Sequence, residues 1–364
     1  MRIPADTLRR VIGETFQAAG CTPEEAGRIG TYLVKANLTG HDSHGVIRTW
    51  RYLKMLSEGA VHANRNITVV LETEGLAVVD GNHGFGQTVG PQAVRLGIDK
   101  AKKTGAAIVA LRSAGHLGRI GDFAEMAAAA DIVSIHLVNV SGSELVAPYG
   151  ARERRMSTNP LAIGVPRPGE PPLILDFATS VVAEGKVAVA FDGGATLPAG
   201  SLIDEHGNLS ADPAVFYGPR KPGEPPNVTT GKGAIRAMGE HKGSGLSIMM
   251  ELLAGALTGS GCSGPAPRRF ANGMLSIYLD PAVVDTKKSF VAEVGQYIDF
   301  IKSAKAITPG GEVLLPGEPE RRREAQRLAE GIELPEATWK EILASAGRAG
   351  LSQNRIDTIL KGQA

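Results

Sequence analysis

The chain has 364 residues, of which 43% are hydrophobic and 21% are charged, and its formal net charge at pH 7 is +1. This composition is typical of a globular protein with two or three domains or lobes. The near-zero charge and the 5% aromatic content argue against nucleic-acid binding, and no apolar run reaches the ~20 residues of a membrane span. The first residues contain no signal-peptide core, so we expect a cytoplasmic protein.

The first sixty residues are predicted to be helical. Residues 4–19 and 23–38 have amphipathic helical spacing, and Thr22 with Glu25 fits a capping box at the start of the second helix. A third helix is expected to end near residue 59.

Strands and helices then alternate, which predicts an α/β layer. Strands are expected at 67–71, 76–80, 107–111, 132–140, 161–165, 173–177 and 274–279. Helices are expected at 87–103, 120–130, 181–190, 242–257, 285–303, 319–330, 336–348 and 353–360. The segment 193–231 is rich in Pro, Gly and Asp and is predicted to be a long irregular loop, which in compact domains is often functional.

The densest group of reactive side chains lies at residues 40–48, GHDSHGVIR. If Ser43 caps a helix here, His44 and Arg48 lie four residues apart on one face. A histidine exchanges protons near neutral pH, and the planar fork of an arginine binds carboxylates. Taken alone, these residues also fit a solvated surface pair. Ser43 has a second possible role, the orientation of His44, and we favour that role.

A glycine run at residues 81–90 follows a strand and opens a helix. Its spacing, Gly84-x-Gly86-x-x-x-Gly90, differs from the G-x-G-x-x-G of dinucleotide-binding folds. The next strand ends in Leu-Arg-Ser at 111–113 instead of in an acidic residue. We therefore predict a strand–turn–helix junction that needs positive φ, not a dinucleotide site.

Two further glycine-rich junctions suit an anionic ligand group. Residues 115–122 place His116 and Arg119 before a helix, and residues 239–245 place Lys242 at a helix start. The strand ends at 157–160 and 176–180 supply hydroxyl and amide groups, which line cofactor sites but also occur in ordinary turns.

Eight sequence strings, in order along the chain, resemble the non-Rossmann malate/L-lactate dehydrogenase family. They are HDSHGVIR at 41–48, GHLGRIGDFA at 115–124, STNPLAIGVP at 157–166, LILDFATS at 173–180, EGKV at 184–187, LPAGSLIDEHGN at 197–208, GEHKGSGLSIMMELLAGALTG at 239–259 and VLLPGEPE at 313–320. The family includes sulfolactate and ureidoglycolate dehydrogenases, diketogulonate reductase, and piperideine- and pyrroline-2-carboxylate reductases.

This resemblance implies an α/β fold distinct from the dinucleotide fold, with a mixed-sheet cofactor domain and a mainly helical domain formed by both chain ends. We expect the helical domain at 1–62 and 283–364 and the cofactor region at 63–282, where 63–115 and 116–282 are candidate lobes. The resemblance also implies a homodimer, NAD or NADP as cofactor, and a small carboxylate substrate.

The resemblance also assigns roles by position. It makes His44 the proton donor or acceptor, Arg48 the ligand of the substrate carboxylate, and His116 a substrate-binding residue. The implied cofactor-binding residues are Gly118, Thr158, Asp176, Phe177, Ala178, Lys186, His241, Lys242, Gly243, Leu315, Pro316, Gly317 and Glu318. The glycine run at 81–90 has no comparable role.

The predicted function is hydride transfer between NAD(P) and a small 2-hydroxy acid or its 2-oxo acid, similar to malate, lactate or sulfolactate. The alternative is NADPH-dependent reduction of a cyclic imino acid. Lys186 disfavours this alternative, because we expect an acidic residue near that position in the imino-acid branch. Arg112, Arg119 and Lys186 are candidates for binding the 2′-phosphate of NADP.

A more distant alternative is a metal hydrolase. His41 and His44 are three residues apart, and Asp42 and His116 are further possible ligands. No HExxH spacing is present, so we predict no metal site.

Overall fold

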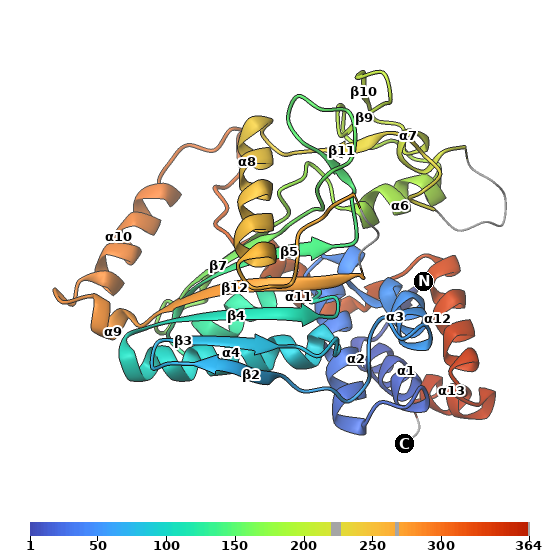
Figure 1. Ribbon diagram of the computed structural model, residues 1–364, viewed down its shortest axis with the longest axis horizontal. Helices are drawn as coiled ribbons and strands as arrows, with labels where there is room; N and C mark the ends of the chain where they lie inside the picture. The colour runs from blue at the N-terminus through green and yellow to red at the C-terminus, as the bar shows by residue number, and fades with distance from the viewer. Residues whose placement is uncertain (220–226, 266–268, 363–364) are drawn as a thin grey trace.

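The computed structural model describes residues 1–219, 227–265 and 269–362, and its centre is a seven-stranded sheet (Figure 1). In spatial order the strands are β2 (Thr68–Glu72), β3 (Leu76–Asp80), β4 (Ala106–Ala114), β12 (Ala271–Leu279), β5 (Val133–Ser141), β7 (Leu161–Val165) and β8 (Leu173–Phe177). Strands β3 and β4 run parallel, and the other neighbours in this sheet are antiparallel. The predicted mixed sheet is confirmed, and its pairing differs from the parallel sheet of a doubly wound dinucleotide fold.

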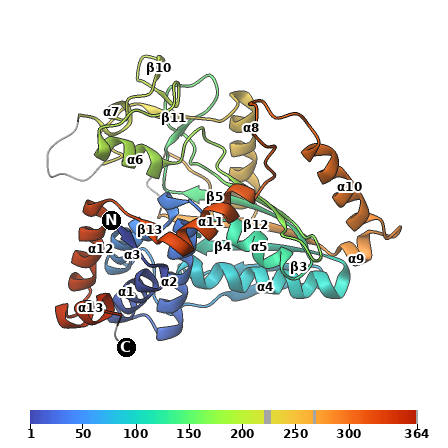
Figure 2. The same cartoon turned by 180° about the vertical axis from the view of Figure 1, so that it is seen from behind.

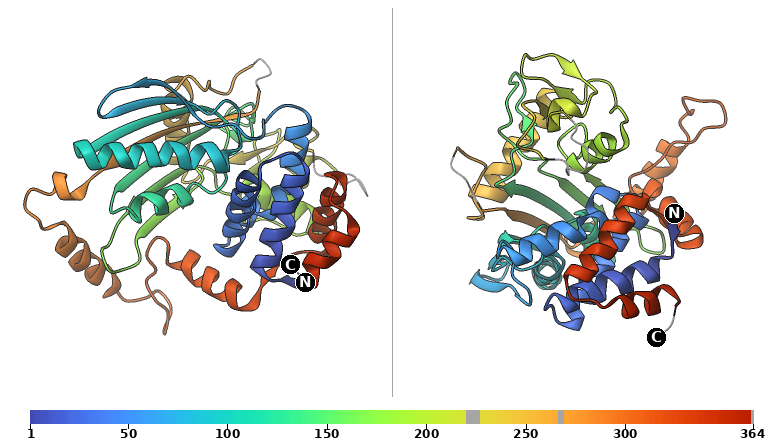
Figure 3. Two further views of the ribbon diagram at one scale, coloured as in Figure 1. Left: turned by 90° about the horizontal axis from the view of Figure 1, so that it is seen from below. Right: turned by 90° about the vertical axis from the view of Figure 1, so that its right-hand side faces the viewer.

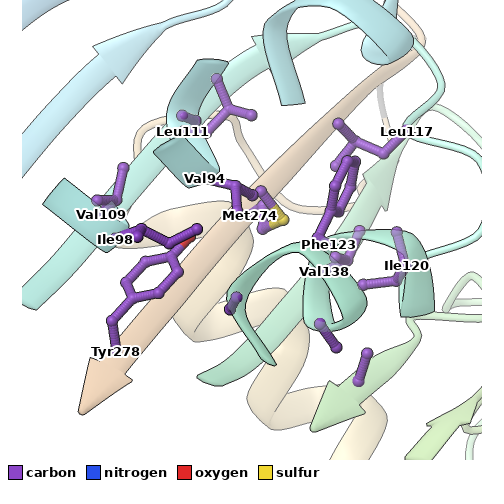
Figure 4. Close-up of a cluster of buried hydrophobic side chains, with 14 of the residues drawn as sticks. Val94, Ile98, Val109, Leu111, Leu117, Ile120, Phe123, Val138, Met274 and Tyr278 are labelled. Carbon is purple, nitrogen blue, oxygen red and sulfur yellow. The ribbon is translucent and has the colours of Figure 1, made fainter. Parts of the chain in front are cut away.

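Helices cover both faces of this sheet (Figures 1 and 2). Helices α4 (Gly86–Thr104) and α5 (Gly121–Ala128) pack on one face, and α8 (His241–Met250) with the π-helical η3 (Glu251–Ala256) packs on the other. Leu111, Phe123 and Tyr278 are fully buried between α4, α5 and the strands (Figure 4). Strand β4 carries an apolar run at 106–111, whereas β5 and β12 include buried polar side chains such as Ser134, His136 and Ser276.

A second hydrophobic cluster joins the two ends of the chain (Figure 3). It contains helices α1 (Ala5–Ala18), α2 (Pro23–Leu38), α3 (Thr49–Ser57), α12 (Glu336–Arg348) and α13 (Gln353–Leu360). Strand β1 (Arg2–Ile3) pairs with β13 (Ile332–Glu333), and α11 (Glu318–Glu330) packs on α2.

A third cluster surrounds a small four-stranded sheet in the order β10-β9-β11-β6. Its elements are β6 (Val146–Ala147), α6 (Glu184–Gly193), β9 (Leu202–Ile203), β10 (Leu209–Ser210), α7 (Ala214–Tyr217) and β11 (Ala234–Arg236). The expectation of an entirely irregular segment at 193–231 is therefore wrong, because β9, β10 and α7 lie within it. Residues 220–226 of that segment lie outside the described residues.

Two predicted helices differ in their limits. The helix expected at 285–303 begins only at residue 290 and is α10 (Phe290–Lys302), with the short helix α9 (Pro281–Val284) before the expected range, and the helix expected from 181 begins at Glu184. The described part of the chain contains no helix with the length and apolarity needed to cross a membrane.

The glycine run at 81–90 is a strand–turn–helix junction, as predicted, but for a different reason. Positive φ occurs at Asn82 and His83, both at 52°, and not at the glycines of the run. Gly86 is required by close packing, because a Cβ there would lie 2.2 Å from the carbonyl oxygen of His116. The glycine therefore fixes where the loop that carries His116 lies against α4.

Replacing Gly86 with alanine is expected to destabilise the protein by about 1–3 kcal/mol, because the added methyl group displaces the His116 loop. Chemical denaturation measures the change in the free energy of unfolding. Gly27→Ala is the matched control. A Cβ at Gly27 in helix α2 meets no atom within 4 Å, so we expect a gain of about 0.5–1 kcal/mol. Equal stability of Gly86→Ala and the wild type would contradict the packing argument.

Candidate active site

The stretch at residues 41–48 forms two 3-10 turns, η1 (Asp42–His44) and η2 (Val46–Arg48), before α3 begins at Thr49. Asn37 of α2 holds this arrangement. Its Oδ1 accepts a hydrogen bond from Val46 N at 2.8 Å, and its Nδ2 donates to Asp42 Oδ1 at 2.7 Å. The expected single helix from Ser43 is therefore wrong, and of the two roles considered for Ser43 the N-cap is not formed, because Asn37 of the preceding helix bonds the backbone instead.

The loop brings His44 against His116. The two rings are stacked, with centroids 5.5 Å apart and an angle of 10° between the planes. Ser43 Oγ lies 3.1 Å from His44 Nδ1, as expected for a residue that orients this ring. Tyr52 Oη lies 2.6 Å from His116 Nδ1 and accepts a hydrogen bond from Gln87 Nε2 at 3.1 Å. The Tyr52 proton is thus available for Nδ1, which leaves the proton of a neutral His116 on Nε2.

Both histidines are neutral in this environment. Burial lowers the pKa of His44 to about 3, and the charge of Arg48 acts in the same direction. Burial and the charge of Arg48 also lower the pKa of His116 well below its ordinary value. A carboxylate bound at Arg48 would offset this positive charge and favour protonation of the histidines.

Arg48 is fixed by two groups. Its Nε donates to the Ser43 carbonyl at 2.6 Å, and its Nη2 lies 3.4 Å from Glu184 Oε2. Arg51 Nη1 lies 3.6 Å from the same oxygen, and Tyr217 Oη donates to Glu184 Oε1 at 2.7 Å. Burial alone would raise the pKa of Glu184, but the charges of Arg48 and Arg51 outweigh it and lower that pKa. This carboxylate is therefore ionised at neutral pH.

The strings that carry the predicted cofactor residues meet along β8 and in the residues directly after it. Ile174 N on this strand donates to Pro316 O at 3.3 Å, and Asp176 Oδ2 accepts from Gly121 N at 2.8 Å. Thr179 N donates to Thr158 O, and Thr179 O accepts from Met238 N, both at 2.9 Å. The structure thus brings together four strings that lie far apart in the sequence.

The same segment links this group to the two histidines. After β8 the chain enters α6, where Gly185 packs on Ser43 so closely that a Cβ would lie 2.3 Å from the Ser43 Cβ. Glu184, the first residue of α6, contacts Arg48. Residues 173–187 therefore connect the cofactor strings to the loop at 41–48.

Several predicted cofactor side chains have structural partners. The Asp176 carboxylate receives Gly121 N and lies 3.8 Å from Arg119 Nε. Glu318 Oε2 accepts from Leu315 N at 2.9 Å, and Glu318 also pairs with Lys302. The carboxylates of Asp176 and Glu318 therefore hold neighbouring backbone and side chains in place and are not free to bind a ligand.

Other predicted cofactor residues are open to a ligand. Lys186, His241 and Lys242 are exposed, and Thr158, Phe177, Ala178 and Gly118 are partly exposed. Gly243 is buried, and a Cβ on it would lie 2.2 Å from Met238 O. Exposed cations beside close-packed glycine backbone fit the phosphates of a nicotinamide dinucleotide.

The three candidates for a 2′-phosphate differ in their surroundings. Arg112 pairs with Asp80 at 2.8 Å, and the fully buried Arg119 pairs with Asp122 at 2.7 Å. Lys186 is exposed on α6. Of these three, Lys186 retains a cation that a phosphate can reach.

The two histidines proposed for the hydrolase alternative have different partners. His41 Nε2 lies 3.7 Å from Glu320 Oε1, whereas His44 stacks on His116. Within residues 1–219, 227–265 and 269–362, no three His, Cys, Asp or Glu side chains are grouped to hold a metal ion. The arrangement gives the hydrolase reading no support.

Six residues that support this site were not predicted from the sequence. They are Asn37, Arg51, Tyr52, Gln87, Glu184 and Tyr217. Tyr52 follows Arg48 by four residues and Glu184 opens the string EGKV, so both had a local signal. The other contacts form across the fold, and Tyr217 comes from the segment predicted to be irregular.

Comparison with known proteins identifies the family of the chain. Residues 3–343 match the family model described as malate/L-lactate dehydrogenase. Hydroxycarboxylate dehydrogenase B of Escherichia coli K12 is 35% identical over 360 residues, which cover 98% of this chain and 96% of that protein.

Two solved structures have the same fold. A putative malate/lactate dehydrogenase from E. coli has a TM-score of 0.92 and 34% identity and covers 100% of this chain and 99% of its own. The delta1-piperideine-2-carboxylate reductase of Pseudomonas syringae pvar. tomato has a TM-score of 0.79 and 30% identity, with 95% and 99% coverage. The fold predicted from the resemblance is confirmed, and the chain belongs to the malate/L-lactate dehydrogenase family.

Proposed function

We propose that this dehydrogenase transfers a hydride between NAD or NADP and a small 2-hydroxy acid or 2-oxo acid, with His44 as proton donor or acceptor and Arg48 as the ligand of the carboxylate. The observation that carries the proposal is the neutral, stacked His44–His116 pair beside the fixed guanidinium of Arg48. The histidine pair can exchange a proton, and the guanidinium of Arg48 can bind an anion.

In the oxidative direction, the substrate carboxylate binds to Arg48 and the hydroxyl lies at His44. Residues around β8 would hold a nicotinamide cofactor, which would supply the hydride acceptor for the carbon that carries the hydroxyl. Neutral His44 takes the hydroxyl proton, and His116 Nε2–H donates a hydrogen bond to the same oxygen. In the reductive direction, protonated His44 returns the proton to that oxygen.

A substrate panel tests this proposal. Purified protein is assayed with 2-hydroxy acids, 2-oxo acids and cyclic imino acids, each with both cofactors, by nicotinamide absorbance. Turnover of a 2-hydroxy acid or 2-oxo acid supports the proposal and identifies the cofactor. Turnover of cyclic imino acids alone would replace it with the second candidate, which the reductase among the similar structures favours.

The pH dependence of oxidation is expected to be unusual for a histidine base. The pKa of His44 is lowered to about 3, so this residue stays in the proton-accepting form as the pH falls below 6.5. We expect kcat/KM for the hydroxy acid to show no loss from histidine protonation between about pH 5 and pH 8. Initial rates across this range measure it. A decline centred near pH 6.5 would contradict a neutral base with a lowered pKa.

We also propose that the protein is a cytoplasmic homodimer. Its helical domain comprises residues 1–62 and 283–364, and its cofactor region comprises residues 63–282. Exposed apolar side chains on α10 and η3 support a subunit interface, because large apolar patches on monomers are rare. They include Val291, Tyr297, Phe300 and Leu252. The hydrophobic cluster shared by both chain ends supports the helical domain. A monomeric mass in light scattering would contradict the dimer.

A further inference from the structure

We infer that Arg51 is a specificity-determining residue: it offsets the charge of Glu184, so that Arg48 stays attractive to the substrate carboxylate. The inference deepens the proposed function and rests on it for the identity of the ligand. The Glu184 carboxylate is shared by two cations, Arg48 and Arg51. Glu184 Oε2 lies 3.4 Å from Arg48 Nη2 and 3.6 Å from Arg51 Nη1.

Glu184 cannot turn away from this contact. Its other oxygen accepts a hydrogen bond from Tyr217 Oη at 2.7 Å, and its side chain is only 10% exposed. Water therefore screens its charge poorly. A second anion that binds to Arg48 meets this fixed carboxylate at close range.

The charge count then depends on Arg51. Arg48 with Glu184 alone makes a neutral pair, and the nearby carboxylate would repel a substrate carboxylate. Adding Arg51 leaves one unit of positive charge in the group, which a carboxylate substrate can neutralise. The geometry suits this role, because Arg48 Nη1 makes no hydrogen bond to the described residues and remains available to the substrate.

Local structure holds Arg51 in place. It lies in the first turn of α3, three residues after Arg48, and its guanidinium lies 5.5 Å from the centroid of the Trp50 ring. The Arg51 side chain is 38% exposed, compared with 14% for Arg48. Arg51 thus lies on the solvent side of Glu184, where it balances charge without blocking Arg48.

The test uses Arg51→Gln, Glu184→Gln and the double variant. Steady-state kinetics with a turned-over 2-oxo acid gives KM and kcat, and titration calorimetry with oxamate gives binding without turnover. We expect Arg51→Gln to raise KM and the oxamate Kd about tenfold, with kcat changed less than about twofold, because the bound carboxylate then faces the uncompensated charge of Glu184. Adding Glu184→Gln to Arg51→Gln is expected to restore both constants, because it removes the repelling charge.

Two further variants sharpen the result. Arg51→Lys keeps the charge and is expected to retain most of the affinity. Lys54→Gln removes one positive charge from the same helix at a 60% exposed position, and it is expected to leave both constants unchanged. The thermal unfolding of each variant is measured to check that the variant is folded.

The outcomes separate the inference from the proposed function. Unchanged constants in Arg51→Gln, or a double variant as weak as Arg51→Gln alone, would overturn the inference. If the wild type turns over no acid but oxamate binding follows the expected pattern, the proposed function fails and the charge balance stands. A wild type that binds no oxamate, with or without NADH or NADPH, overturns both.

Discussion

Replacing His44 with asparagine is expected to lower kcat about 100- to 10,000-fold, the usual contribution of a general acid–base group. Asparagine keeps a polar side chain of similar reach but cannot exchange a proton. Arg48 stays bound to the Ser43 carbonyl at 2.6 Å, so KM for the acid should change little. Steady-state kinetics with the best acid of the panel measures both constants.

His41→Asn is the matched control, because it removes another histidine from the same loop. His41 faces Glu320 instead of His116, so we expect normal turnover in this variant. His116→Asn is expected to lower kcat less than His44→Asn, since His116 supplies a hydrogen bond and not the proton. The reverse order would move the acid–base role to His116, and full activity in His44→Asn would remove His44 from the mechanism.

Local chemistry explains which parts of the fold were predictable. Helix α2 begins at Pro23 as expected, with Thr22 Oγ1 accepting the Glu25 N–H at 3.3 Å. The second half of the expected capping box does not form. The Glu25 carboxylate accepts instead from Thr88 Oγ1 at 2.8 Å, a residue of α4. Four consecutive residues are enough to predict the N-cap of α2. They do not show that Thr88, in another helix, binds the Glu25 carboxylate.

The glycine run at 81–90 was also only partly interpretable from the sequence. Its spacing was sufficient to reject a dinucleotide-binding turn, and the mixed sheet agrees with that. The reason for the glycines was not readable, because the Gly86 position is set by His116, thirty residues later in the chain. Close approach of two backbones leaves no local signature.

In the candidate site, the reactive residues were predictable from the sequence and their supporting partners were not. His44, Arg48 and His116 were chosen from motifs, and the structure brings them together. Their supporting partners were not found, because Asn37, Glu184 and Tyr217 act through tertiary contacts. Motifs identify side chains with reactive chemistry, whereas the contacts that set charge and orientation depend on how distant segments pack.

Replacing Arg48 with glutamine is expected to raise KM for the carboxylate substrate about 10- to 100-fold, since hydrogen bonds to charged groups contribute about 1.5–3 kcal/mol. The change in kcat should be smaller, because His44 keeps its contact with Ser43. Arg48→Lys tests whether charge alone suffices. A lysine retains the charge but not the planar fork, and it cannot reach the Ser43 carbonyl and the substrate with the same geometry. We therefore expect Arg48→Lys to recover only part of the affinity, and Arg48→Gln with an unchanged KM would place the carboxylate elsewhere in the site.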